Sequence, residues 1–148
     1  MGPPRASPDR FLDGFLPHLL ARGAEAAAEA FHAELRSRGT AVPVWRVLAA
    51  LAGGRAQAVT ALAAACLLQQ PTMTKVLDRM ERQGLVGRHA DDGDRRRVLI
   101  HLTPAGRKRA APVLRAAKAH EARLLAPFTA EERAVIKRAL DLLINGRA

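Results

Sequence analysis

The stretch from Thr60 to Leu102 reads TALAAACLLQQPTMTKVLDRMERQGLVGRHADDGDRRRVLIHL, and its pattern decides the fold. Its first half predicts two short helices: an alanine-rich one over residues 61–68, capped by Thr60, and one that begins at Pro71 and stops before Gly84. Two helices joined by so short a turn are typical of a helix-turn-helix.

The apolar period changes from 3.6 to 2 near the end of this stretch. Val98, Ile100 and Leu102 occupy alternate positions, which is the pattern of a half-buried strand. Residues 85–88 are its predicted partner, and residues 91–94, Asp-Asp-Gly-Asp, have the composition of a turn. The sequence therefore predicts a mainly α protein with a small β-wing, a two-stranded hairpin.

Apolar residues spaced by three or four predict further helices on both sides of this stretch. Both terminal segments are amphipathic and too long for the small central region to cover, so their apolar faces need a partner. The 148 residues are predicted to form a single domain with these parts: a flexible tail (1–7), N- and C-terminal dimerisation helices (8–38 and 104–146), and a winged helix-turn-helix DNA-binding region (43–102).

Proline and threonine mark several predicted helix ends. Pro17 separates a short opening turn from a long helix, and Thr103 caps a helix that reaches about residue 125. Pro112 predicts a kink within that helix. Thr129 and Glu132 form a capping box that opens the last helix.

The chain is strongly basic, with 24 Lys and Arg against 14 Asp and Glu, a formal net charge of +10 and a pI near 11.4. Such a balance indicates a polyanionic partner, either nucleic acid or an anionic membrane surface. Between Gln70 and Arg109, ten basic residues stand against five acidic ones. Half of the surplus is therefore concentrated in these 40 residues, which include the predicted recognition helix and hairpin, and this favours DNA.

The second helix of the predicted motif has an apolar side, formed by Met73, Leu77 and Met80, and a polar side suited to base edges and phosphates. Its N-terminus adds the positive end of the helix dipole. Three consecutive arginines follow the hairpin turn, where a minor groove would pass. The candidate DNA contacts are Gln70, Thr72, Thr74, Lys75, Arg79, Arg88, Arg95, Arg96 and Arg97.

Acidic residues in the hairpin turn need an explanation, because this turn is predicted to lie near the negatively charged DNA. We expect Asp92 or Asp94 to pair with an arginine and to stiffen the loop. The alternative is a solvated turn of mixed charge.

The segment LDRMERQGLVGRHADDGDRRRVLIHLTPAGR, Leu77–Arg107, resembles the multiple-antibiotic-resistance regulator (MarR) family of bacterial transcription factors. The family-like features are the stop at residues 84–86, the wing Asp-Arg-Arg at 94–96, the strand leading into 102–106, and upstream the helix at 44–48. The resemblance covers nearly the whole chain from Phe15 onward. It implies a transcriptional regulator, most often a repressor, that binds a pseudo-palindromic operator in double-stranded DNA as a homodimer with interleaved terminal helices.

The resemblance also implies an effector pocket between the dimer and DNA-binding regions. Residues that combine aromatic walls with positive charge would suit a small aromatic carboxylate or phenolate. The candidate lining residues are Phe15, His18, Leu19, Arg22, Trp45 and Arg46. The alternative is that the aromatic residues are core, Arg22 is a surface residue and Arg46 pairs with an acid.

Other chemistry finds little support. The single cysteine, Cys66, lies in an apolar run and is expected to be a buried filler, with peroxide sensing as the alternative. The five histidines show no metal-ligand spacing, and no nucleophile stands beside a base. With no signal peptide and no stretch of about 20 apolar residues, we expect a cytoplasmic protein without membrane contact, cofactor, metal or enzymatic activity.

Two rival functions remain open. A non-specific architectural or nucleoid protein would use the same domain without preferring any operator, so the ratio of specific to non-specific affinity separates it from a regulator. A protein-interaction module would use the wing to bind another protein, and its DNA affinity would not depend on Arg95 and Arg96.

Overall fold

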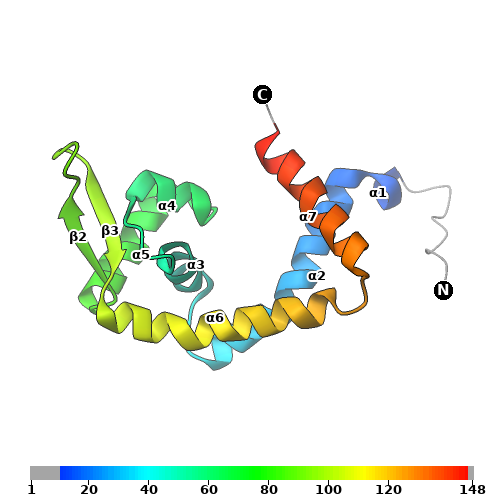
Figure 1. The fold of residues 1–148 in the computed structure, drawn as a ribbon, viewed down its shortest axis with the longest axis horizontal. Coiled ribbons are helices and arrows are strands. Elements are labelled where there is room, and N and C mark those ends of the chain that lie inside the picture. The colour runs from blue at the N-terminus through cyan, green and yellow to red at the C-terminus, as the bar shows by residue number, and fades with distance from the viewer. Residues whose placement is uncertain (1–10, 147–148) are drawn as a thin grey trace. The chain divides into compact units, whose positions relative to one another are not determined.

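A computed structural model describes residues 11–146 (Figure 1). The predicted tail over residues 1–7 and the first residues of the predicted segment 8–38 lie outside the described residues. Helices predominate, with a small sheet, which confirms the predicted mainly α class. The elements are α1 (Phe11–Gly14), α2 (Leu16–Ser37), α3 (Val42–Leu51), β1 (Gln57–Ala58), α4 (Val59–Ala65), α5 (Gln70–Arg82), β2 (Val86–Ala90), β3 (Val98–Leu102), α6 (Pro104–Leu125) and α7 (Ala130–Asn145).

The chain divides into two compact units between Val113 and Leu114. The first unit holds α1 to α5, the three strands and the beginning of α6. Figure 1 shows α3, α4 and α5 gathered beside the strands of this unit. The second unit holds the remainder of α6, together with α7.

The core of the first unit lies where α3, α4 and α5 meet the sheet. Each helix contributes leucine or methionine from its apolar side, and β3 contributes Ile100, so that the inward faces exclude water. Fully buried side chains include Leu48, Leu51, Leu62, Met73, Leu77, Met80 and Ile100. The inward side predicted for α5 is thus confirmed.

The sheet has three antiparallel strands in the order β1–β3–β2. The hairpin of β2 and β3 follows the predicted pattern, with Val86 opposite Leu102 and Arg88 opposite Ile100. Of the alternating residues on β3, Ile100 and Leu102 are buried, whereas Val98 is exposed toward the tip. The third strand, β1, adds to the predicted hairpin by pairing with β3, and it is too short to show a period of 2.

The first helix of the motif differs from its prediction at both ends. It begins at Val59, preceded by Ala58 as N-cap, so Thr60 lies inside the helix and is not its cap. It ends at Ala65 rather than at Leu68. Leu67 turns the chain toward α5 in the left-handed region, with φ of 56°.

Most other helix ends agree with the predictions. Thr129 and Glu132 form the capping box at the start of α7. Thr103 accepts a hydrogen bond from the amide of Gly106 and so caps α6. Gly84 adopts φ of 71° just after α5, where a left-handed residue ends a helix readily.

Candidate nucleic-acid interface

Helix α5 presents a polar side opposite its buried one. Gln70, Thr72, Thr74, Lys75 and Arg79, the five residues predicted to read DNA from this helix, are all exposed. The hydroxyl of Thr74 donates to the carbonyl of Gln70 at 3.1 Å, which leaves its lone pairs free to accept. The sequence pattern thus placed these side chains correctly on the solvent side of α5.

The N-terminus of α5 is open. Gln69 occupies the N-cap position without a side-chain hydrogen bond to the helix, and Pro71 stands in the first turn. The unsatisfied amides of a first turn and the positive end of the helix dipole attract an anion such as a DNA phosphate. This end of α5 is therefore suited to approach the duplex backbone.

The tip of the wing is built by its own acidic residues. The Asp91 carboxylate accepts from the amide of Gly93 at 3.1 Å, and the Asp94 carboxylate accepts from the amide of Arg96 at 3.0 Å. A backbone hydrogen bond of 2.8 Å from Asp91 to the Arg97 carbonyl closes the loop. The aspartates thus shape the turn that carries the arginines.

The expected ion pair in this turn has a different acid partner. Asp91, not Asp92 or Asp94, lies beside an arginine in the described part of the chain, and its carboxylate stands 4.0 Å from the Arg97 guanidinium. Position 91 directly follows β2 and faces the end of the loop, which brings it near Arg97. Arg95 and Arg96 are exposed, and within residues 11–146 their guanidinium groups have no ion-pair partner.

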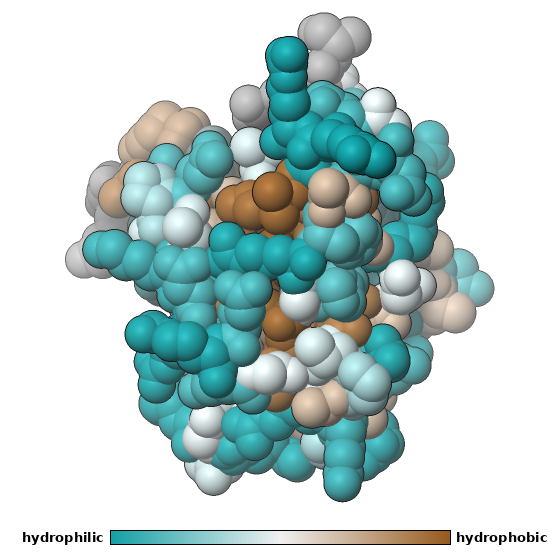
Figure 2. Space-filling view, turned by 90° about the vertical axis from the view of Figure 1, so that its left-hand side faces the viewer, coloured by the Kyte–Doolittle hydropathy of each residue, from teal (hydrophilic) through white to brown (hydrophobic). Residues whose placement is uncertain are grey.

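The side of the molecule that carries the wing is mostly hydrophilic (Figure 2). On the face of the hairpin away from the core, the Nδ1 atoms of His89 and His101 lie 3.0 Å apart. Gly87, opposite His101 in the register, leaves the space that the His101 ring occupies, since a Cβ there would lie 2.6 Å from its Nε2.

Arg88 behaves differently from the other predicted DNA contacts. Its side chain extends from β2 toward α5, where it forms ion pairs with Asp78 at 2.5 Å and with Glu81 at 3.2 Å. In the sequence, Asp78 and Glu81 count only toward the charge balance. Their spacing of three residues places them on one side of α5, but their partner depends on how β2 packs there.

Arg79 lines a hollow of about 340 Å³ beside the start of α3. Arg109 of α6 lies at the same hollow and donates hydrogen bonds to the Gly39 carbonyl and the Thr40 hydroxyl. Two guanidinium groups at one hollow attract an anion. No local sequence pattern indicates Arg109 or Thr40, because the two are 69 positions apart and only the fold brings them together. The remaining lining residues are Ala41, Val44, Gln83 and Leu85.

The six residues predicted to line an effector pocket do not gather at this hollow. Phe15 stacks on Phe11, with ring centroids 5.0 Å apart, and Trp45 packs edge-on against Phe31 at 5.1 Å. Arg46 donates to the Cys66 carbonyl at 3.1 Å. The pocket over these residues stays a prediction.

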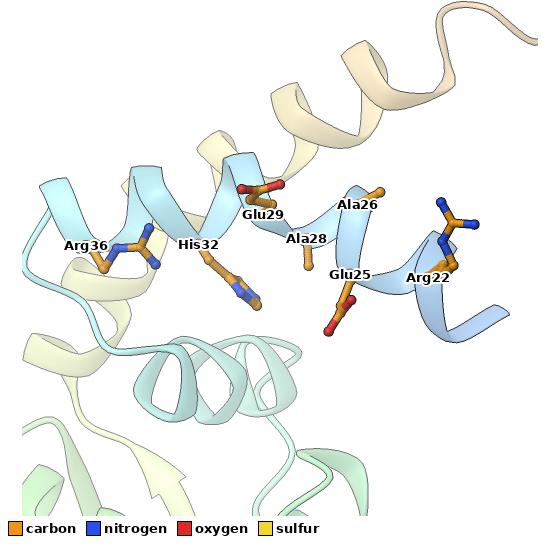
Figure 3. A pocket seen from close by; sticks show the side chains of 7 residues that line it. All are labelled: Arg22, Glu25, Ala26, Ala28, Glu29, His32 and Arg36. Atoms are coloured by element: carbon orange, nitrogen blue, oxygen red, sulfur yellow. The ribbon is translucent and has the colours of Figure 1, made fainter. Parts of the chain in front are cut away.

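Arg22 lines a different hollow, of about 590 Å³, whose seven lining residues all belong to α2. Figure 3 shows them spread along the helix from Arg22 to Arg36, with Glu25 and His32 on one side and Glu29 on another. A hollow walled by one helix lacks the enclosure that is typical of a small-molecule site.

Cys66 is buried, as expected of a core filler. Burial raises the pKa of its thiol, while the positive charge of Arg46 acts in the opposite direction. Among residues 11–146 no three His, Cys, Asp or Glu side chains come together as a metal site. None of the helices in this range is long and apolar enough to cross a membrane.

Comparison with known proteins agrees with this geometry. A sequence profile of the MarR family matches residues 39–97. The transcriptional regulator PecS of Dickeya dadantii is 36% identical over 87 residues, which are 56% of this chain and 52% of PecS, so the match spans about half of that relative. BpsR of Bordetella bronchiseptica, whose DNA binding is regulated by 6-hydroxynicotinic acid, shares the fold at 24% identity, with a TM-score of 0.79 over 94% of this chain and 99% of BpsR.

A solved MarR family transcriptional regulator, SPO1453 of Silicibacter pomeroyi, is 41% identical to this chain. The comparison covers 91% of this chain and 99% of SPO1453, with a TM-score of 0.81. These relatives are regulators rather than enzymes, which agrees with the expected lack of enzymatic activity. The chain belongs to the MarR family of transcriptional regulators.

Proposed function

We propose that the protein is a sequence-specific DNA-binding repressor, which binds a pseudo-palindromic operator as a homodimer and is released by a small aromatic acid. The observation that carries this proposal is the arrangement of α5. Its buried side, with Met73 and Leu77, fixes the helix to the core, and its open N-terminus and polar side face solvent. A recognition helix enters the major groove in this orientation.

The wing supplies the second contact in this proposal. Arg95 and Arg96 project from a turn whose backbone is held by Asp91 and Asp94, so they reach a groove without first having to become ordered. Arginine in a narrow minor groove is favoured by the negative potential there. Together α5 and the wing would read one half-site from two adjacent grooves.

A second copy of the chain would cover the apolar side chains that one copy leaves exposed. One exposed set lies on α1 and α2 and includes Phe11, Leu16 and Leu19. The other lies on α7 and includes Val135, Leu142 and Ile144. Such clusters mark an interface in a soluble protein, and a two-fold dimer presents two recognition helices to half-sites about one duplex turn, roughly 10 bp, apart.

The hollow at Arg79 and Arg109 is the site at which we place the effector. Its volume of about 340 Å³ suits a single aromatic ring. Its guanidinium groups would hold a carboxylate, with Val44 and Leu85 beside the ring. Because Arg79 also belongs to α5, an effector that draws this side chain into the hollow would change the helix that reads DNA. The aromatic acid that regulates BpsR supports this choice of ligand.

The test of DNA recognition begins with selection of bound duplexes from a random library. Binding of the selected duplex and of a scrambled one is then measured by fluorescence anisotropy at several salt concentrations. We expect the selected duplex to bind about 1,000-fold more tightly at physiological salt, with strong salt dependence. Equal affinities would contradict the proposal and favour an architectural protein. DNA affinity that is unchanged in an Arg95→Ala, Arg96→Ala variant would favour a protein-interaction module.

The effector is tested by calorimetric titration with a panel of hydroxylated aromatic acids. We expect at least one acid to bind the protein and to weaken its binding to the operator. Arg109→Gln should reduce binding of this acid, because the substitution removes a cation from the hollow. Phe15→Ala is the matched comparison at the other predicted pocket. If Phe15→Ala abolishes effector binding and Arg109→Gln does not, the effector binds at the pocket residues predicted from the sequence, which include Phe15.

A further inference from the structure

Arg88 joins the wing to the recognition helix through one guanidinium group. Its Nη2 atom lies 2.5 Å from the Asp78 carboxylate, and its Nε atom lies 3.2 Å from the Glu81 carboxylate. Both acids belong to α5, whereas Arg88 belongs to β2. The group therefore bridges two structural elements and not two neighbours on one element.

The sheet register directs Arg88 toward α5. Arg88 stands opposite Ile100, which is completely buried, and it shares a face of β2 with the buried Val86. Side chains at alternate strand positions point to the same face. Arg88 thus extends along the inner face of the hairpin, and its side chain is only 31% exposed.

The two carboxylates need a cation between them. Asp78 and Glu81 are three residues apart, so they lie on the same side of α5, where like charges repel. The planar guanidinium presents several donors in a fixed fork and can bind both acids at once. An ammonium group is a single point charge and lacks this fork.

We infer that Arg88 is a positioning residue that holds the wing at a fixed place relative to α5, and that Asp78 and Glu81 support operator recognition although they are acidic. This inference rests on the proposed function and deepens it. Specific reading requires the wing arginines and the α5 side chains to meet their grooves together. A wing that moves freely on α5 still attracts phosphates but loses that register.

The competing hypothesis is that Arg88 contacts a DNA phosphate. The two hypotheses predict opposite changes in operator affinity when Asp78 and Glu81 are made neutral. If Arg88 only contacts phosphate, replacing Asp78 and Glu81 by neutral residues removes repulsion and strengthens binding to any duplex. If Arg88, Asp78 and Glu81 form a tether, that is, a set of ion pairs that holds the wing on α5, the same replacement weakens operator binding despite the more favourable charge.

The experiment compares the wild-type protein with an Asp78→Asn, Glu81→Gln double variant, with Arg88→Lys, and with Asp92→Asn. Asp92 is an exposed acid of the wing turn for which no ion pair is found among the described residues, so Asp92→Asn controls for loss of negative charge. Affinities for the operator and for a scrambled duplex are measured over a series of salt concentrations.

We expect the double variant and Arg88→Lys to lose about tenfold in operator affinity, the size of one lost base-pair contact, without losing affinity for the scrambled duplex. Asp92→Asn strengthens binding to both duplexes. The inference is overturned if Arg88→Lys binds the operator like the wild type, since lysine still serves a phosphate, or if the double variant binds it more tightly.

Amide hydrogen exchange without DNA separates this inference from the proposed function. We expect the amides of β2 and β3 to exchange faster in the double variant and in Arg88→Lys than in Asp92→Asn, with circular dichroism confirming that all variants are folded. Unchanged exchange rates overturn the tether. A wild-type protein that shows no operator preference overturns the proposed function, while the exchange rates still decide whether the tether exists.

Discussion

Gly106, in the first turn of α6, lies so close to Leu85 that a Cβ at position 106 would overlap the Leu85 carbonyl oxygen. That carbonyl also accepts a hydrogen bond of 3.1 Å from the amide of Thr103. The Thr103 hydroxyl in turn donates to the Gly84 carbonyl at 2.5 Å. The start of α6 therefore lies directly against the segment between α5 and β2, with no space for a side chain between Gly106 and Leu85.

Replacement of Gly106 by alanine should therefore destabilise the first unit. Because the clash is with backbone and not with a flexible side chain, the chain must shift, and we expect the free energy of unfolding to fall by about 1–3 kcal/mol. Urea denaturation followed by circular dichroism measures this. Gly23→Ala is the control, since Gly23 lies within α2 with nothing within 4 Å, and alanine there should stabilise the helix by up to about 1 kcal/mol. Equal stability of Gly106→Ala and the wild type would contradict the close approach.

Leu67 adopts a left-handed backbone conformation that leucine rarely takes. Its φ is 56°, and the residue is 80% exposed, so packing of the side chain offsets little of the backbone strain. Because asparagine tolerates this region, Leu67→Asn should raise the free energy of unfolding by about 0.5–1 kcal/mol. Leu67→Ala removes the same side chain but keeps the strain, and it should give no such gain. The two variants are compared in the same denaturation experiment, and equal values would rule out relief of strain.

Cys66 should be a poorly reactive thiol. Burial raises its pKa, so less thiolate is present near neutral pH than for an exposed cysteine, and a disulfide reagent should modify it slowly until the protein is unfolded. The folded state disfavours the thiolate. The stability linked to this group is therefore complete below the pKa of the unfolded thiol and is lost as pH rises through the folded value.

The pH dependence provides the control for this prediction. Above about pH 8.5, the ordinary value for a thiol, the wild type should lose stability more steeply than Cys66→Ala. Rapid modification of the native protein at neutral pH would contradict a buried filler and would reopen the alternative of peroxide sensing.

The wing arginines should contribute to the salt dependence of DNA binding. Each of Arg95 and Arg96 is exposed, and a phosphate contact by either should add about 0.9 to the slope of log affinity against log salt. We expect Arg95→Ala to weaken binding to both the operator and a scrambled duplex, the operator more strongly, and to reduce that slope. Arg138→Ala, an exposed arginine on α7, is the control. An unchanged slope for Arg95→Ala would show that Arg95 does not contact DNA.

Local patterns predicted the fold well where each element has a period of its own. The alternation of Val98, Ile100 and Leu102 indicated β3, and the buried Met73 and Leu77 follow the helical spacing of α5. Strand β1 has no such period because it has only two residues and forms through its pairing with β3. The cap at Thr60 was wrong for a related reason, since that pairing ends at Ala58 and α4 begins directly after it.

The candidate site was predictable only in part. Exposure of Lys75 and Arg96 follows from helical spacing and from turn composition, both of which are local. The partners of Arg88 depend on the packing of β2 against α5, and the meeting of Arg79 with Arg109 depends on where α6 begins. Contacts between side chains that are distant in sequence leave no local pattern. The ion pairs of Arg88 and the hollow at Arg79 can therefore be recognised only in the three-dimensional structure.

Breaking the proposed dimer should be possible from α7 alone. Leu142 is 59% exposed and Ile144 is 72% exposed in the single chain, although both are large and apolar. If a second copy covers them, Leu142→Asp with Ile144→Asp buries two charges at the interface, and sedimentation equilibrium should show a monomer at micromolar concentration. Operator affinity should fall with it, because one recognition helix then binds without the other. Leu67→Asn, which removes an exposed leucine from the helix-turn-helix, should remain dimeric. A double variant with the mass of a dimer would place the contact between copies elsewhere on the chain.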